Sequence, residues 1–391
     1  WMHKYPHYGA PEPRIGFLQE ALRWWDRWLK GIDTGVENDP AYRAYVMDSV
    51  RPARWHDARP GRWVAEAQWP SRNIEMREIE LLGHGQAPVF VSTPQDCGLT
   101  GGEYFPFTFG PELPGDQRDD DALSVCFDQP MLDVAIDIVA APELALRLSA
   151  DKPQANIAVR LCDVHPDGAS ELISYGVLNL SHSGSHEHPE ALVPDKAFDA
   201  CVMLDQCAYR VPAGHRLRIA ISTSCWPMIW PSPETVELTI SSADLVLPVR
   251  PLASGDEITF QPPEAATPWA IDTLRPNRSE RRVTRDETTG ATVLNIVDDF
   301  GEVRDREHGL VNGSIVRETW TIHPGDPSSA RGETHWTQTL SRSDWSVRTE
   351  TFSEMTCDAQ NFYLKAKIQA FEGDELAFER AFEEKIRRDH I

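Results

Sequence analysis

The chain has 391 residues, which is more than one hydrophobic core usually holds, so two or three domains are expected. Its 38 basic and 61 acidic residues give a formal net charge of −23, and a surface this acidic disfavours binding to nucleic acids or to anionic membranes. No apolar run approaches the roughly 20 residues that a membrane-spanning helix needs.

The first predicted element is an amphipathic helix near the start of the chain. Its apolar residues recur at spacings of three and four: Phe17, Leu18, Ala21, Leu22, Trp25, Trp28 and Leu29. This period is typical of a helix with one buried face, and Gly31 supplies a stop signal. The indoles need a covering surface, part of which we expect upstream, because Trp1 and Met2 do not look like a natural start. The chain is therefore expected to be a fragment of a longer protein.

Residues 32–114 predict a connector that becomes β structure. Short strands are expected at 42–47 and 76–82. The segment 98–114 contains paired glycines and several aromatic residues without a regular period. We expect its aromatic side chains to plug an interface between domains.

Residues 115–250 give the strongest strand signals. Apolar or alternating runs separated by Pro, Gly and Asp turns occur at 134–139, 144–149, 157–164, 172–180, 198–204, 217–222 and 236–247. This pattern favours an antiparallel sandwich over βαβ units. The sequence His165-Pro-Asp-Gly168 is typical of a tight hairpin turn between two of these strands.

Two clusters in the sandwich region invite a functional interpretation. His182, His186 and His188 lie close to Glu187 and could ligate a metal, but their loop has no element to fix the ligands, so no metal is predicted. Trp226 and Trp230 could form a stacking platform for a sugar or an aromatic substrate. The alternative is that the two indoles cap the sandwich core where it meets a neighbouring domain.

Beyond a linker at 254–268, alternating runs predict an up-and-down antiparallel meander with one wet face, over 292–297, 315–322, 333–340, 346–352, 362–370 and 376–382. The last run also fits helical spacing, but the meander favours a strand. Asp298-Asp-Phe-Gly301 is interpreted as a hairpin turn, because the partners of a kinase motif are absent. The acidic clusters at 119–121 and 298–305 lack the calcium-loop pattern and are expected to be solvated turns.

Several motifs resemble the CocE/NonD hydrolases, which are relatives of the X-Pro dipeptidyl-peptidases. Trp1-Met2-His3 is similar to the end of their Gly-Pro-Trp-x-His motif, and residues 20–36 are similar to the helix that follows it. Residues 116–123, 146–168 and 212–233 resemble their C-terminal β-sandwich in order and spacing. The resemblance runs from Trp1 to about Leu252. It implies a jelly-roll topology, an acyl pocket bordered by Tyr104 and Phe105, and His3 as the general base of a Ser-Asp-His triad.

The rest of that triad is not visible in this sequence. No G-x-S-x-G segment occurs, and Gly184-Ser185 lies in the His-rich loop with the wrong surroundings. The seven cysteines are scattered without a CxxC pair, which predicts reduced core thiols in a cytoplasmic protein rather than a nucleophile or a disulfide framework. The serine and the acid are therefore expected upstream of residue 1, and no cofactor is predicted.

The sequence thus predicts a mainly β fold in three parts. Residues 1–40 are the remnant of an α/β-hydrolase domain, 41–252 a galactose-binding-like jelly roll, and 253–391 an additional antiparallel β domain. The predicted function is that of the C-terminal region of a serine hydrolase acting on a small acyl ester, amide or peptide, with the jelly roll walling the active site. The alternatives are a carbohydrate-binding module, with Trp226 and Trp230 as platform, and a structural module for dimerisation; a homodimer stays open.

Overall fold

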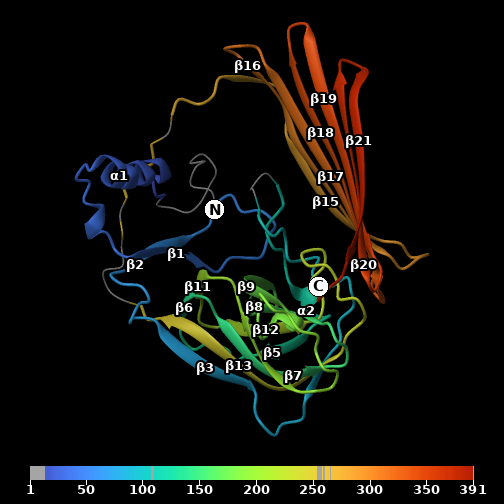
Figure 1. Cartoon of the computed structure of the whole chain (residues 1–391). Helices are drawn as coiled ribbons and strands as arrows, with labels where there is room; N and C mark the ends of the chain where they lie inside the picture. The colour runs from blue at the N-terminus through green and yellow to red at the C-terminus, as the bar shows by residue number, and fades with distance from the viewer. Residues whose placement is uncertain (1–13, 107–109, 253–257, 259, 265, 391) are drawn as a thin grey trace.

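The computed structural model describes residues 14–106, 110–252, 258, 260–264 and 266–390. These residues form a two-sheet β-sandwich, a long helix beside it, and a tall C-terminal sheet that rises from one end of the sandwich (Figure 1). The predicted mainly β fold, with a sandwich followed by an antiparallel meander, is confirmed. The prediction that His3 belongs to a catalytic motif concerns a residue outside the described part.

The larger sheet of the sandwich has the strand order β10-β7-β13-β6-β11-β1-β2, with β3 and β4 also paired to β13. Neighbouring strands in this sheet pair antiparallel, except β1 and β11, which pair in parallel. The strand bounds are β1 Tyr42–Asp48, β2 Gly61–Glu66, β3 Glu75–Leu82, β4 Val89–Val91, β6 Ile136–Ala140, β7 Glu143–Ala150, β10 Phe198–Met203, β11 Cys207–Val211 and β13 Leu238–Arg250.

The smaller sheet has the order β5-β12-β8-β9 and is antiparallel throughout. Its strands are β5 Val125–Asp128, β8 Asn156–Val164, β9 Ser170–Asn179 and β12 Arg216–Ser222. Three short helical segments accompany the sandwich: η1 Val36–Asn38, α2 Arg118–Asp121 and η2 Leu180–His182. One contiguous apolar core fills the sandwich, with Leu144, Leu148, Ile157 and Leu161 fully buried in it.

The predicted turn at 165–168 joins β8 to β9 and is confirmed. The His165 N–H donates to the Ala169 carbonyl at 2.8 Å, and the Gly168 N–H donates to the His165 carbonyl at 2.9 Å. Gly168 has φ +89°, a left-handed conformation that a residue without a Cβ adopts at little cost.

The C-terminal sheet is an eight-stranded antiparallel meander in which most strands pair with the next one along the chain. Its strands are β14 Ile271–Arg275, β15 Arg278–Arg285, β16 Thr292–Asp305, β17 Val311–His323, β18 Asp326–Arg342, β19 Trp345–Cys357, β20 Asn361–Glu372 and β21 Glu375–Arg387. The last predicted run is therefore a strand and not a helix, since β21 pairs with β20 from Glu375 to Arg387 with one register shift at Ala370–Phe371.

The prediction of a hairpin turn at Asp298–Gly301 is wrong. These residues lie inside β16, whose pairing with β17 shifts register between Asp299 and Glu302. Gly301 has φ +83°, and its N–H donates to Asp299 Oδ1 at 2.9 Å. The turn-forming residues thus produce a β-bulge, because pairing on both sides of it keeps the chain extended.

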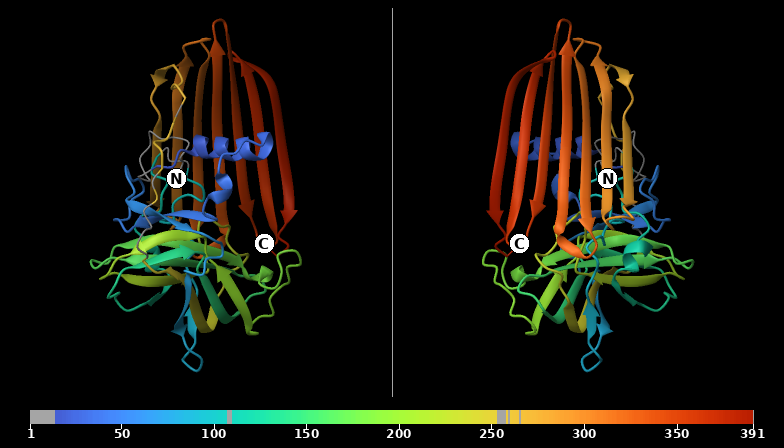
Figure 2. Two further views of the ribbon diagram at one scale, coloured as in Figure 1. Left: turned by 90° about the vertical axis from the view of Figure 1, so that its left-hand side faces the viewer. Right: turned by 90° about the vertical axis from the view of Figure 1, so that its right-hand side faces the viewer.

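The predicted amphipathic helix is present as α1, Phe17–Lys30, and ends at Gly31 with φ +71°. None of its residues is buried by the described part of the chain, and Leu22, Trp25 and Trp28 are each more than half exposed. In both views of Figure 2, α1 lies opposite one face of the C-terminal sheet. Nowhere in the described ranges is a helix long and apolar enough to cross a membrane.

Candidate functional site

The candidate substrate contacts Tyr104 and Phe105 lie on the loop between β4 and α2. Tyr104 is 79% exposed and Phe105 is 61% exposed. The loop itself is held by contacts within it and with the C-terminal sheet. The Glu103 N–H donates to the Glu112 carbonyl at 2.9 Å, and the Glu103 carboxylate pairs with Arg281 of the C-terminal sheet. The role of Tyr104 and Phe105 as substrate contacts stays a prediction.

Trp226 and Trp230 lie at the joint between the sandwich and the C-terminal sheet. Trp226 is fully buried, and its ring meets Trp230 at 5.4 Å and Trp320 of β17 at 5.9 Å, both edge to face. Trp230 packs edge to face on Phe362 of β20, and its Nε1 donates to Cys357 Sγ at 3.1 Å. Trp226 and Trp230 thus pack between the sandwich and the C-terminal sheet, as in the alternative to a stacking platform.

A small cavity of about 300 Å³ opens beside this joint, lined by Asn156, Ile229, Trp230, Phe362 and Arg388 among others. Trp226 has no exposed ring face, so a sugar could stack on it only if the joint opened. Arg388 closes the same region, with its guanidinium over Phe362 at 4.6 Å and a hydrogen bond to the Pro231 carbonyl. Substrate binding by Trp226 and Trp230 stays a prediction, which the packing does not favour.

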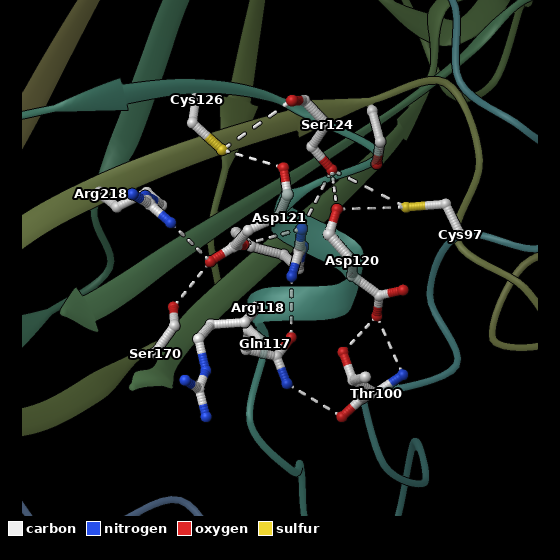
Figure 3. A network of polar contacts seen from close by, with 12 residues as sticks. Cys97, Thr100, Gln117, Arg118, Asp120, Asp121, Ser124, Cys126, Ser170 and Arg218 are labelled. Carbon is white, nitrogen blue, oxygen red and sulfur yellow. Dashed lines mark hydrogen bonds and ion pairs between the residues drawn. The ribbon is translucent and has the colours of Figure 1, made fainter. Parts of the chain in front are cut away.

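The acidic residues at 119–121 differ from the sequence-based expectation. Asp120 and Asp121 are 2% and 4% exposed, so the prediction of a solvated turn is wrong for both, and only Asp119 faces solvent. Asp120 Oδ1 accepts the Gly98 N–H at 2.9 Å. Its Oδ2 accepts the Thr100 N–H at 2.9 Å (Figure 3). Asp120 thereby fixes the start of the loop that carries Tyr104 and Phe105.

Asp121 is the centre of a buried charge network, which Figure 3 shows from close by. Its carboxylate lies 3.1 Å from both the Arg160 and the Arg218 guanidinium, and it accepts the Ser170 hydroxyl at 2.8 Å. Gln117 completes the network: its Oε1 accepts Arg160 Nη1 at 2.9 Å, and its Nε2 donates to the carbonyl oxygens of Gly115 and Thr100. Helix α2 therefore connects the aromatic loop to both β8 and β12 through buried polar groups.

A second buried polar network, which the sequence did not predict, lies around Tyr209. The Tyr209 hydroxyl is 2.9 Å from Asp163 Oδ2 and 2.6 Å from Glu171 Oε2. Desolvation and these two carboxylates raise the pKa of Tyr209 well above its usual value. His215 Nδ1 lies 2.8 Å from Asp163 Oδ1, and Glu171 accepts Arg59 Nη2 at 2.5 Å.

Part of this network could in principle hold a metal ion. Asp163, His165 and His215 each place a ligand atom within 4.8 Å of the other two. The Asp163 oxygens, however, already accept Ser49 Oγ at 2.6 Å and Tyr209, and they contact His215. Asp163 and His215 therefore belong to a satisfied hydrogen-bond network, whereas the buried Nε2 of His165 has no hydrogen-bond partner among the described residues. In the His-rich loop, the rings of His182 and His186 lie 5.6 Å apart at a tilt of 42°, and the side chain of His188 is 81% exposed.

The thiols have the properties of inert core groups. All seven cysteines are free and lie in the described part of the chain, and only Cys201 is exposed. Burial raises the pKa of Cys97, Cys162 and Cys225 to about 12 each, so these thiols stay protonated near neutral pH. The expectation that no cysteine is a nucleophile stays a prediction.

We therefore expect a thiol reagent to distinguish Cys201 from the buried cysteines. At pH 8 the native chain should react rapidly with about one equivalent of Ellman's reagent, and the remaining thiols should react only after unfolding in denaturant. The variant Cys201→Ser is the control and should lose the fast phase. Rapid labelling of Cys97 or Cys225 in the native chain would contradict the burial.

Comparisons with known proteins place these features in a family. Residues 34–269 match the family described as the X-Pro dipeptidyl-peptidase C-terminal non-catalytic domain. A Bacillus cereus protein assigned as an Xaa-Pro dipeptidyl-peptidase is 21% identical over 254 residues, which are 64% of this chain and 40% of that protein. The cocaine esterase of Rhodococcus sp. (strain MB1 Bresler) is 21% identical over 237 residues, which are 54% of this chain and 39% of the esterase.

Solved structures with a similar arrangement include an aminopeptidase from a marine sediment Thaumarchaeota archaeon, with TM-score 0.45 and 14% identity over 62% of this chain and 47% of that one. A CocE/NonD family hydrolase from Staphylococcus aureus gives TM-score 0.44 and 14% identity over 59% and 45% of the two chains. The chain spans about two-fifths of the length of the curated relatives it matches. Because the family match covers the whole sandwich and more than half of the sequence, this chain belongs to the X-Pro dipeptidyl-peptidase C-terminal non-catalytic domain family.

Proposed function

We propose that this chain is the C-terminal region of a serine hydrolase of the esterase or peptidase type, whose nucleophile and acid lie upstream of residue 1. The family match over residues 34–269 supports the proposal, because its description is that of the C-terminal non-catalytic domain of a dipeptidyl-peptidase. The names of the relatives, a peptidase and an esterase, support a hydrolase as the complete protein. Their greater length leaves room for a catalytic domain, since the match covers only 39–40% of each.

The exposed apolar surface of α1 supports a covering domain. Phe17, Leu22, Trp25 and Leu29 are between 52% and 74% exposed, although a helix of this pattern normally buries one face. The described contacts of α1 are mainly ionic, with Arg23 paired to Glu20 and Asp39. A catalytic domain packed on this face would remove the indoles from water, which stabilises the complete protein by the hydrophobic effect.

In the proposed enzyme, His3 is the general base. Its imidazole takes the proton of the serine hydroxyl while the serine oxygen attacks the ester or amide carbonyl, and it then gives that proton to the leaving group. Water, deprotonated by the same imidazole, cleaves the acyl-enzyme and regenerates the serine. The sandwich walls the active site, and the loop with Tyr104 and Phe105, which Asp120 holds in place, limits the size of the acyl group.

The test is to read the coding sequence ahead of the first codon and to express the complete protein. We expect a G-x-S-x-G segment and an acidic residue upstream, and hydrolysis of an aryl ester such as 4-nitrophenyl acetate. The variant His3→Ala should lower kcat/KM by about a thousandfold or more. The matched control His188→Ala changes an exposed histidine of the His-rich loop and should leave kcat/KM unchanged. Full activity of His3→Ala would refute the proposed base.

A further inference from the structure

The outer strand of the C-terminal sheet, β21, is an unusually long free edge. It has 13 residues, all of them exposed, and among the described residues it pairs with β20 alone. Figures 1 and 2 show it at the edge of the tall sheet, away from the sandwich for most of its length. A strand of this length presents about 40 Å of backbone, whose outward N–H and C=O groups are available to another strand.

Apolar side chains accompany this edge. Phe378, Phe382 and Ile386 are spaced by four residues, so they share one face of the regular part of β21, and they are 44–52% exposed. They lie opposite Ala370, Ala366 and Phe362 of β20. Proteins usually protect an edge with charges or a short strand, and β21 has charges but also these large apolar groups. The arrangement of the charges decides whether the edge repels another strand or selects one.

The charges of β21 complement those of a second copy of the same strand in one register. Opposite residues of an antiparallel pair share a face. A two-fold axis normal to the sheet must therefore lie midway between the two copies of one residue, which is then paired with its own copy. With Phe382 on the axis, Arg380 faces Glu384 of the other copy and Glu379 faces Lys385, and each pair occurs twice. The same register places Phe378 opposite Ile386 and Phe382 opposite Phe382, so apolar groups also meet apolar groups.

The neighbouring registers are electrostatically unfavourable. An axis at Ala381 would place Glu379 opposite Glu383, and axes at 379, 380, 383, 384 or 385 would each place a charged residue opposite its own copy. Like charges directly opposite each other destabilise a strand pair. Within the chain, the Glu379 carboxylate already lies 2.9 Å from Lys367 Nζ, which holds it on the sheet face where Lys385 of a second copy would arrive.

We propose that β21 is a homodimerisation edge, at which two copies of this chain pair antiparallel about a two-fold axis through Phe382 and join their C-terminal sheets into one. The occupant is a second copy because the complementarity comes from the sequence of β21 itself. The contact is one strand edge, smaller than a standard interface of about 1,600 Å², so the dissociation constant is expected in the micromolar range. The inference does not rest on the proposed hydrolase function.

Disulfide trapping tests the axis. In a Cys201→Ser background, which removes the exposed native thiol, Phe382→Cys should form a covalent dimer under oxidised glutathione, since paired strand positions match disulfide geometry. The matched control Phe378→Cys has a cysteine on the same face, but its mate would be eight residues away along the strand, about 27 Å. It should form no covalent dimer, whereas Phe378→Cys combined with Ile386→Cys should cross-link.

Charge reversal tests the register without new thiols. In sedimentation equilibrium at about 0.15 M salt, Arg380→Glu should weaken dimerisation by about tenfold or more, because it puts a carboxylate in place of the guanidinium that faces Glu384 of the other copy. Adding Glu384→Arg should restore the dissociation constant to within about threefold of the parent. The proposal is overturned if the parent chain is monomeric up to about 100 µM, or if Phe378→Cys cross-links as readily as Phe382→Cys. It is also overturned if the second charge reversal gives no recovery.

Discussion

The variant Asp121→Ala is expected to lose about 3–5 kcal/mol of stability. Asp121 and Arg160 are 4% exposed each, and their charged groups lie 3.1 Å apart. Removing the carboxylate leaves the Arg160 guanidinium buried with only neutral partners, Gln117 Oε1 at 2.9 Å and Ser124 Oγ at 3.0 Å. Ser170 also loses the acceptor of its hydroxyl. Urea unfolding followed by tryptophan fluorescence measures the loss.

A matched control for this variant lies in the same four-residue helix. Asp119→Ala removes the same side chain two positions earlier, but from an exposed site, and should change the free energy of unfolding by less than about 0.5 kcal/mol. Arg160→Met should cost less than Asp121→Ala, because Asp121 keeps the Arg218 guanidinium at 3.1 Å and the Ser170 hydroxyl at 2.8 Å. The double variant should cost less than the sum, because the Arg160 guanidinium is then not left buried without its carboxylate. Equal effects at Asp119 and Asp121 would mean that both carboxylates are solvated in solution.

The cost of the same substitution thus depends on partners that are distant in sequence. Asp121 meets Arg160, Ser170 and Arg218, which come from three different strands of the smaller sheet. A run of three aspartates has the composition of a solvated turn, and the chain around it gives no local signal of burial. The family resemblance includes residues 116–123, but it does not predict that the carboxylates of Asp120 and Asp121 are buried and hold the fold together.

The long strands were predictable for the opposite reason, because their signal is local. Residues 346–352 and 362–370 alternate polar with apolar side chains along the sequence, and this period predicted the meander. The missed strands β14 and β15 lack that period, since β15 contains four arginines and a glutamate among eight residues. They are strands because β16 offers them a paired edge, which is a tertiary effect.

At the candidate site, residue types were easier to predict than surroundings. Trp226 and Trp230 were recognised as a pair at the end of the sandwich, but whether their rings face solvent depends on where the C-terminal sheet docks. Likewise, the network of Tyr209, Asp163 and His215 assembles residues from β11, β8 and the turn before β12. No spacing of these residues along the sequence predicts these contacts.

The second large effect is expected for Trp226→Ala, which should cost about 3–5 kcal/mol through the cavity that it leaves. Trp226 is fully buried between Trp230 of the sandwich and Trp320 of the C-terminal sheet, so the cavity would separate the two bodies. We expect calorimetry of Trp226→Ala to show a separate unfolding transition for the C-terminal sheet. Its midpoint should lie below the temperature at which the sheet unfolds in the parent chain. Trp226→Phe should cost clearly less, because the buried Nε1 has no hydrogen-bond partner within the described ranges.

Trp336→Ala is the control, since it removes an indole that is 45% exposed on β18 of the same sheet. It should shift the transition only slightly, although Trp336 Nε1 donates to Ser314 Oγ at 2.7 Å. The comparison also separates the two interpretations of Trp226. A packing role predicts a large loss of stability and no saturable sugar binding in the parent chain. If Trp226→Ala instead kept the parent stability and abolished the binding of a sugar, Trp226 would be a ligand platform and the joint would be open in solution.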